Sequence, residues 1–164
     1  MNKLIREIEK IDLKLIKKNK EKIKNEIIET PVSRVASSYL DRLLPNSEIF
    51  MKLELFQHTG TFKARGALTV ANEIEKEKRK FGITAASAGN HAVAASWAAY
   101  KLGMSAKVVM RSTANPYRIS QAKMNKAEIM IGDEIDEVIK TAKELVDKES
   151  RTFNHPFEGL NTTL

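Results

Sequence analysis

The 164-residue sequence contains no cysteine, which excludes disulfide bridges and thiolate metal clusters and suits a reducing compartment. No apolar run approaches the roughly 20 residues that cross a bilayer, and charged residues crowd the N-terminal segment. We therefore predict no membrane-spanning helix, no secretory signal and no membrane partner. The expected protein is a cytoplasmic, soluble globule, since 42% hydrophobic residues are enough to build a core.

Aromatic residues are scarce at 6% of the chain, and Tyr39 is the only one before residue 50. This scarcity matters because the net charge of +7 invites a nucleic-acid interpretation. The densest basic run lies in residues 14–24 and has no aromatic platform on which bases could stack. The run is better explained as the solvated face of a helix, so nucleic-acid binding ranks last among the candidate functions.

Hydrophobic periodicity divides the chain into an N-terminal helix and an alternating region. Apolar residues recur every three or four positions in residues 1–29, which predicts an amphipathic helix that breaks or bends near Asn19 and ends before Pro31. The predicted strands are "EIFMKLEL" (48–55), "GITAAS" (82–87), "AKVVMR" (106–111), "EIMIG" (128–132) and "RTFNH" (151–155). The predicted helices are 63–80, 90–103, 115–126 and 135–149. Strands that alternate with helices of this length predict an α/β fold, with a parallel sheet between flanking helix layers.

One lysine lies in an unusual setting, in the stretch "HTGTFKARGA" (58–67). Lys63 falls in the first turn of a predicted helix, directly after a predicted strand. The helix macrodipole opposes a cation at this end, so we expect the pKa of the Lys63 amine to be lowered. Such an amine is suited to forming a Schiff base with an aldehyde cofactor. An exposed lysine without a role is the alternative from position alone.

A second strand-to-helix junction carries "TAASAGNHA" (84–92). Ser87, Gly89 and Asn90 supply a hydroxyl, an open backbone and an amide before an apolar helix, which suits an anion such as a carboxylate. A plain helix cap is the alternative explanation.

The two junctions together resemble those of the fold-type II pyridoxal-phosphate enzymes, in particular the threonine/serine dehydratases. The matching stretches are "TPVSR" (30–34), "KLELFQHTGTFKARGA" (52–67), "ASAGNHA" (86–92) and "FNHPFEG" (153–159). The resemblance implies a truncated form of the two-domain tryptophan-synthase-β-like fold. Residues 30–85 would belong to the larger cofactor domain and residues 86–164 mainly to the smaller α/β domain.

By this resemblance Lys63 would be the Schiff-base lysine and the catalytic base, Phe62 would pack beside the cofactor ring, and Asn90 would hydrogen-bond its phenolic oxygen. The substrate carboxylate would bind the backbone N–H groups of one loop, formed by Ser87, Ala88, Gly89, Asn90 and His91. The three histidines lack metal-ligand spacing, so no metal site is predicted. Lys126 departs from the family, because it stands at a position often filled by glycine.

The implied activity is that of an ammonia-lyase, which converts threonine or serine into a 2-oxo acid and ammonia and would suit isoleucine biosynthesis. Serine racemases are also similar, but they carry a second serine where this chain has Ala88, and a methyl group exchanges no proton. We also expect a homo-oligomer. Family members are about twice as long, and the seven glycines here are scattered, so no glycine-rich cradle for the cofactor phosphate is present. We therefore expect this chain by itself to bind the cofactor weakly and to have little or no activity, and a non-catalytic folding or association unit is the remaining alternative.

Overall fold

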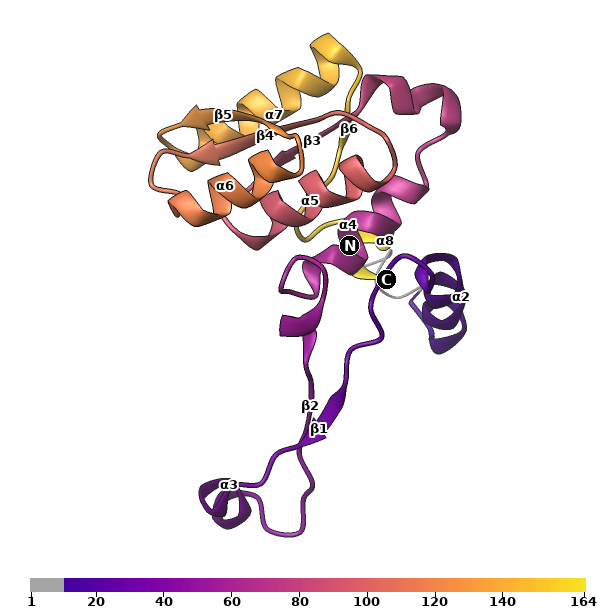
Figure 1. The fold of residues 1–164 in the computed structure, drawn as a ribbon, viewed down its shortest axis with the longest axis vertical. Helices are drawn as coiled ribbons and strands as arrows, with labels where there is room; N and C mark the ends of the chain where they lie inside the picture. Colours follow the sequence, from indigo (N-terminus) through magenta and orange to yellow (C-terminus); the bar gives the residue numbers. More distant parts are fainter. Residues whose placement is uncertain (1–10) are drawn as a thin grey trace, which may run out of the picture.

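The computed structural model describes residues 11–164 and contains a parallel four-stranded sheet (Figure 1). The strand order is β5-β4-β3-β6, and each neighbouring pair is parallel. The strands are β3 (Ile83–Ala86), β4 (Ala106–Arg111), β5 (Glu128–Gly132) and β6 (Thr152–Phe153). The predicted α/β class and parallel sheet are thereby confirmed.

Helices cover both faces of this sheet, as Figure 1 shows. α5 (Asn90–Lys101) and α6 (Pro116–Met124) lie on one face, and α7 (Ile135–Glu149) lies on the other. The start of α6 has a clear local cause, because the Asn115 side chain accepts a hydrogen bond from the Tyr117 N–H and Pro116 occupies the first turn.

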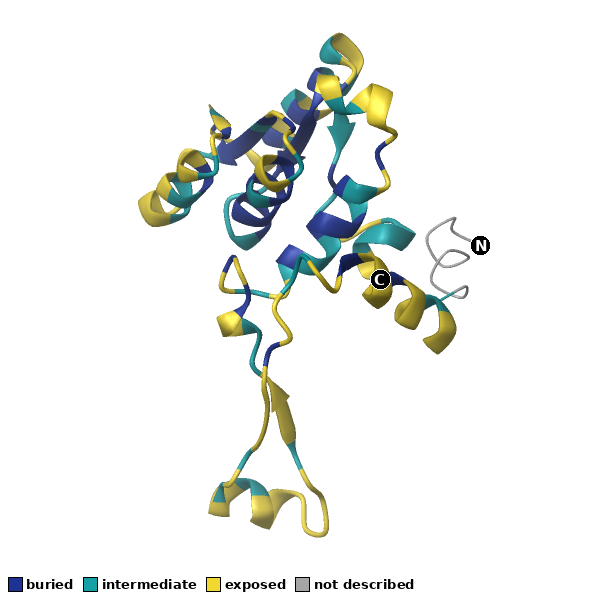
Figure 2. Ribbon diagram, turned by 45° about the vertical axis from the view of Figure 1, so that its right-hand side comes forward, coloured by how far each residue is buried: buried dark blue, intermediate teal, exposed yellow. Residues whose placement is uncertain are grey.

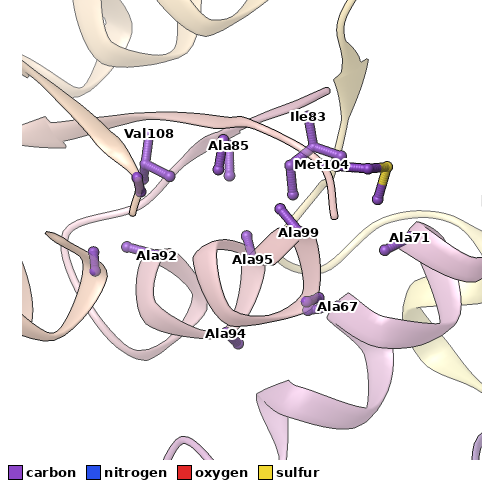
Figure 3. Close-up of a cluster of buried hydrophobic side chains, with 14 of the residues drawn as sticks. Ala67, Ala71, Ile83, Ala85, Ala92, Ala94, Ala95, Ala99, Met104 and Val108 are labelled. Carbon is purple, nitrogen blue, oxygen red and sulfur yellow. The ribbon is translucent and has the colours of Figure 1, made fainter. Parts of the chain in front are cut away.

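Small side chains let α4 (Lys63–Asn72) pack closely against α5. Ala67 and Ala71 of α4 face the alanines of α5 in one buried cluster (Figure 3). Leu68 lies in the same cluster and has no exposed surface. Since close-packed helices leave little freedom of movement, this contact fixes the start of α4 relative to the start of α5. A second cluster lies between α7 and the sheet and consists of Ala86, Val109, Val138, Ala142 and Leu145.

A long arm projects from the sheet region (Figure 1). It contains β1 (Val32–Arg34), α3 (Ser38–Leu43) and β2 (Phe50–Lys52), and the two strands pair antiparallel. Figure 2 shows the arm mostly as exposed, in contrast to the buried sheet. At its base, the Glu54 carboxylate binds Arg65 of α4 at 2.7 and 2.9 Å.

Several predicted bounds were wrong near the arm. The strand predicted over 48–55 is only three residues long and leads into the 3₁₀ turn η1 (Glu54–Phe56). The helix predicted over 63–80 ends at Asn72, where the Arg79 side chain donates to the Asn72 and Ile74 carbonyls and satisfies the helix end. A separate 3₁₀ turn, η2 (Lys76–Phe81), follows.

The N-terminal helix is described in part. α2 spans Leu13–Ile23, while residues 1–10 of the predicted helix lie outside the described residues. The predicted break near Asn19 is wrong, since α2 continues through this residue. The buried Asn19 amide donates to the Thr69 hydroxyl at 3.0 Å and joins α2 to α4.

Two further features complete the fold. A short C-terminal helix, α8 (Leu160–Thr163), packs on α4 so closely that a Cβ added at Gly66 would lie 2.5 Å from the Thr162 carbonyl oxygen. The predicted domain division after residue 85 falls within β3, and the assignment to two domains stays a prediction. Over residues 11–164, the helices are too short or too polar to cross a bilayer.

Candidate active site

A cavity of about 810 Å³ opens at the carboxyl ends of β3 and β6. Parallel sheets place their ligand sites at this edge, because the loops that follow the strands meet there. Four parts of the chain contribute the lining: the start of α4, the end of β3 with the segment after it, the end of β6 with the segment after it, and one side of α7. The lining residues are Lys63, Ala86, Ser87, Ala88, Asn90, His91, Ile135, Ile139, Lys143, Phe153, His155, Pro156, Phe157 and Glu158.

At the start of α4, the Lys63 amine contacts one backbone carbonyl and two aromatic rings. Nζ donates to the Pro156 carbonyl oxygen at 2.6 Å. It also lies 4.4 Å from the centre of the Phe157 ring and 5.1 Å from that of Phe62. Burial lowers the pKa of Lys63 below its ordinary value. The predicted direction is therefore confirmed, with burial of the amine as the cause.

The loop between β3 and α5 presents unused backbone donors. Gly89 caps α5 without a side-chain hydrogen bond, and its own N–H donates to Ser87 Oγ at 3.3 Å. Within residues 11–164, the N–H groups of Ala88, Asn90 and His91 donate to no acceptor. Free N–H groups at the positive end of a twelve-residue helix bind anions well. The loop can therefore receive a carboxylate.

His91 is buried and neutral at the edge of this loop. Its Nε2 lies 2.8 Å from the Asn154 carbonyl oxygen, while no partner reaches Nδ1 from the described part of the chain. Burial, more than any neighbouring charge, lowers the pKa of His91 to about 4. Because a carbonyl only accepts, Nε2 carries the hydrogen and Nδ1 is left as a buried acceptor.

Asn154 connects the elements that carry the predicted site residues. It has no exposed surface, its side-chain amide donates to the Ala67 carbonyl of α4, and its N–H donates to the Thr84 carbonyl of β3. Together with the His91 contact, these bonds hold α4, β3 and α5 in one arrangement. The relative placement of Lys63 and the loop thus depends on a buried polar network.

The segment after Asn154 turns back onto Lys63. His155 Nδ1 accepts hydrogen bonds from the N–H groups of Phe157 at 3.2 Å and Glu158 at 2.7 Å. This turn brings the Pro156 carbonyl and the Phe157 ring against the Lys63 amine. Burial also lowers the pKa of His155, which favours the neutral ring that this turn requires.

The structure brings most of the predicted site residues into one cavity. Lys63, Ser87, Ala88, Asn90 and His91 all line it. Two predicted residues do not. Phe62 is 59% exposed and touches Lys63 from the rim, in an adjoining hollow, and Gly89 forms the cap of α5 behind the lining. The roles assigned to these residues stay predictions.

Sequence reasoning missed the far wall of the cavity. Ile135, Ile139 and Lys143 of α7 follow one another at four-residue steps, which places them on one side of the helix. The "FNHPFEG" stretch was noted for its resemblance, but no role had been given to His155 or Phe157. The helical spacing was a visible signal, yet only the fold shows which side of α7 borders the cavity.

The sequence profile described as "Pyridoxal-phosphate dependent enzyme" matches residues 23–163. The chain belongs to this family. Two curated relatives are similar in sequence. The phenylserine dehydratase of Ralstonia pickettii is 40% identical, and the match covers 74% of this chain and 37% of the relative. The biosynthetic L-threonine dehydratase of Bacillus subtilis is 35% identical, and the match covers 96% of this chain and 38% of the relative.

Solved structures agree with this family assignment. Maize serine racemase has a TM-score of 0.83 at 27% identity, covering 92% of this chain and 45% of the racemase. A threonine deaminase from T.th. has a TM-score of 0.79 at 32% identity, covering 93% and 47%. The chain spans 37% to 41% of the length of the curated relatives it matches.

The cavity fits the reactive end of pyridoxal phosphate, the cofactor of this family. It offers the half-buried Lys63 amine for the aldehyde carbon and an Asn90 side chain that makes no hydrogen bond within residues 11–164. This sequence offers less for the phosphate end of the cofactor. Its seven glycines are scattered and form no glycine-rich loop whose backbone N–H groups could bind a phosphate.

Proposed function

We propose that this chain forms the lysine-bearing part of an ammonia-lyase that converts a β-hydroxy amino acid into a 2-oxo acid and ammonia. One observation carries the proposal: Lys63 and the loop after β3, which has free N–H groups, line the same cavity. The relatives named phenylserine dehydratase and L-threonine dehydratase support this class of reaction.

Three residues would contact the cofactor. Lys63 would bind its aldehyde carbon covalently, and the Asn90 amide would donate to its phenolic oxygen, with Phe62 beside the ring. When bound, pyridoxal phosphate supplies an electron sink for the pair left at the substrate Cα. The loop after β3 and the positive end of α5 would bind the substrate carboxylate and fix the orientation of Cα.

Lys63 is the proposed base. Once the substrate amino group has displaced it from the aldehyde carbon, the free Nζ would accept the α-proton, and the lowered pKa favours the unprotonated amine that this step requires. Nζ would then pass this proton to the β-hydroxyl, which leaves as water. The Phe62 and Phe157 rings flank Nζ, with ring centres at 5.1 and 4.4 Å, although both rings are more than half exposed.

Ala88 favours a dehydratase over a racemase. It lines the cavity at the position where the similar serine racemases carry a serine, and its methyl group holds no exchangeable proton. A non-catalytic association unit remains the alternative if the cavity binds the cofactor without turnover. We further propose a cytoplasmic homo-oligomer with a small amino-acid substrate, and a place in isoleucine biosynthesis if threonine is preferred.

Turnover at saturating pyridoxal phosphate tests the proposal. We expect the chain to release 2-oxo acid and ammonia from L-threonine or L-serine, and Lys63→Ala to abolish this release. Lys123→Ala is the matched control, because Lys123 is exposed on α6 and does not line the cavity. Cofactor bound to Lys63 without any keto acid would contradict the lyase and support the association unit. Formation of D-serine as the main product would support the racemase.

A further inference from the structure

The wall that α7 contributes to the cavity is apolar over its first two turns. Ile135 and Ile139 line the cavity, and Phe153 of β6 adds an aromatic ring beside them. Ile135 is 51% exposed, although it lies beside the stripe of α7 that buries Val138, Ala142 and Leu145, and Ile139 and Phe153 pack partly against that buried cluster. An isoleucine left exposed in a cavity offers apolar surface that a ligand can cover.

The other walls also contain apolar side chains, but they carry polar groups that account for two of the three non-hydrogen groups on an amino-acid Cα. The loop after β3 offers backbone N–H groups to a carboxylate, and Lys63 lies on the side of the amino group. The third substituent, which carries the β-carbon, is left to face α7 and Phe153. Serine, threonine and phenylserine share the β-hydroxyl and differ only in the second group on this carbon, which is hydrogen, methyl or phenyl.

Three further ionisable side chains line the cavity, those of Lys143, His155 and Glu158. His155 Nε2 and the Glu158 carboxylate are 3.8 Å apart, and the His155 Nδ1 is occupied by the turn after it. Lys143 is one turn beyond Ile139 and forms no ion pair with residues 11–164. Between Ile135 and Ile139, α7 presents no polar side chain to the cavity. A small polar side chain would gain nothing there.

We propose that the wall formed by Ile135, Ile139 and Phe153 selects β-hydroxy amino acids with a bulky apolar group on the β-carbon, such as an aryl group, over serine. The selection rests on the proposed lyase function. Its basis is burial of the β-substituent, since each methylene-sized contact in an apolar pocket changes discrimination by about tenfold or more.

Competition between substrates tests this selection in the full chain. With saturating cofactor, kcat/KM is measured for β-phenylserine, threonine and serine in the chain itself, in Ile135→Ser and in Ile131→Ser. Ile131 is the matched control, because it is 54% exposed on β5 and does not line the cavity. Saturation-transfer NMR of β-phenylserine without cofactor gives a second readout that does not depend on turnover.

We expect phenylserine to be preferred over serine by at least about tenfold, and Ile135→Ser to reduce this ratio about tenfold while Ile131→Ser leaves it unchanged. The phenyl protons should also receive saturation from the chain and lose it in Ile135→Ser. Equal use of serine and phenylserine, or a ratio insensitive to Ile135→Ser, would overturn the selection while the lyase function stands. A preference for β-hydroxyaspartate would overturn it as well and would point to Lys143. The absence of both turnover and NMR contact would remove the lyase and the selection together.

Discussion

The sheet region and the arm use strands of similar length in opposite environments. All four residues of β3 are buried, whereas every residue of β1 and β2 is exposed. β3 has a strand on each side and helices on both faces, while β1 and β2 pair only with each other. An isolated two-stranded hairpin is marginally stable in water. Residues 11–164 thus contain one self-supporting core, and the arm depends on its base for placement.

The cavity belongs to the core region alone. None of its lining residues comes from the arm, and the network of Asn154 that positions them lies within the sheet and its helices. The arm nevertheless carries large apolar side chains that are more than half exposed, including Val32, Leu43 and Phe50. An apolar segment is therefore not necessarily part of the core in this chain. Burial depends on whether the segment belongs to the four-stranded sheet and its helices.

The largest difference between the two regions should appear in matched leucine substitutions. Leu68→Ala removes a fully buried side chain and should lower the free energy of unfolding by about 3 kcal/mol. Leu43→Ala in the arm removes a side chain that is 57% exposed and should change it by less than about 0.5 kcal/mol. Urea unfolding measures both. Similar losses for the two variants would show that the arm has a core of its own.

Acid should weaken the core region through His91. Its pKa is about 4 when folded and 6.5 in the unfolded chain, so only the unfolded state gains a proton between these values. Stability should therefore fall by about 3 kcal/mol as the pH drops from 6.5 to 4, and this loss should be absent above pH 6.5. Unfolding of His91→Gln across the same pH range should show a flatter profile. An unchanged profile would contradict the buried, neutral ring.

The Glu54–Arg65 ion pair joins the arm to the core region, and its loss should lower the free energy of unfolding. Arg65 holds the pKa of the Glu54 carboxyl below its ordinary value, because both guanidinium contacts favour the charged form. Glu54→Gln should cost about 1 kcal/mol. Glu48→Gln is the control, since the exposed Arg34–Glu48 pair lies at 3.2 Å within the arm and should contribute less than about 0.5 kcal/mol. Equal effects would mean that the joint is no stronger than a surface pair.

The smallest expected effect on stability comes from replacing one residue with left-handed backbone geometry in each region. Lys126 between α6 and β5 has φ of 58°, and Asn46 in the arm has φ of 67°. Lysine is strained in this conformation while asparagine tolerates it. Lys126→Gly should therefore raise the free energy of unfolding by about 0.5 kcal/mol, more than Asn46→Gly does. Thermal unfolding compares the two, and a larger gain in the arm would reverse the assignment of strain.

The accuracy of the sequence-based predictions also differs between the sheet region and the arm. The predicted bounds of β4, β5 and α7 match the structure, because apolar runs there end at clear loop residues. The 48–55 prediction failed because the apolar residues of the arm mimic a buried strand. Local motifs identified Lys63 and Asn90 at strand-to-helix junctions. Ile135 and Asn154 were missed, since the sheet order and long-range hydrogen bonds that place them leave no local trace.

The most direct test of the account is the site at which pyridoxal phosphate attaches to the chain. Borohydride reduction of the chain with the cofactor, followed by peptide mapping, locates the attachment. The account predicts modification concentrated on Lys63, since its amine combines a lowered pKa with a place in the cavity, and predicts loss of that modification in Lys63→Arg. Modification spread over exposed lysines such as Lys148, with Lys63 unmodified, would contradict it.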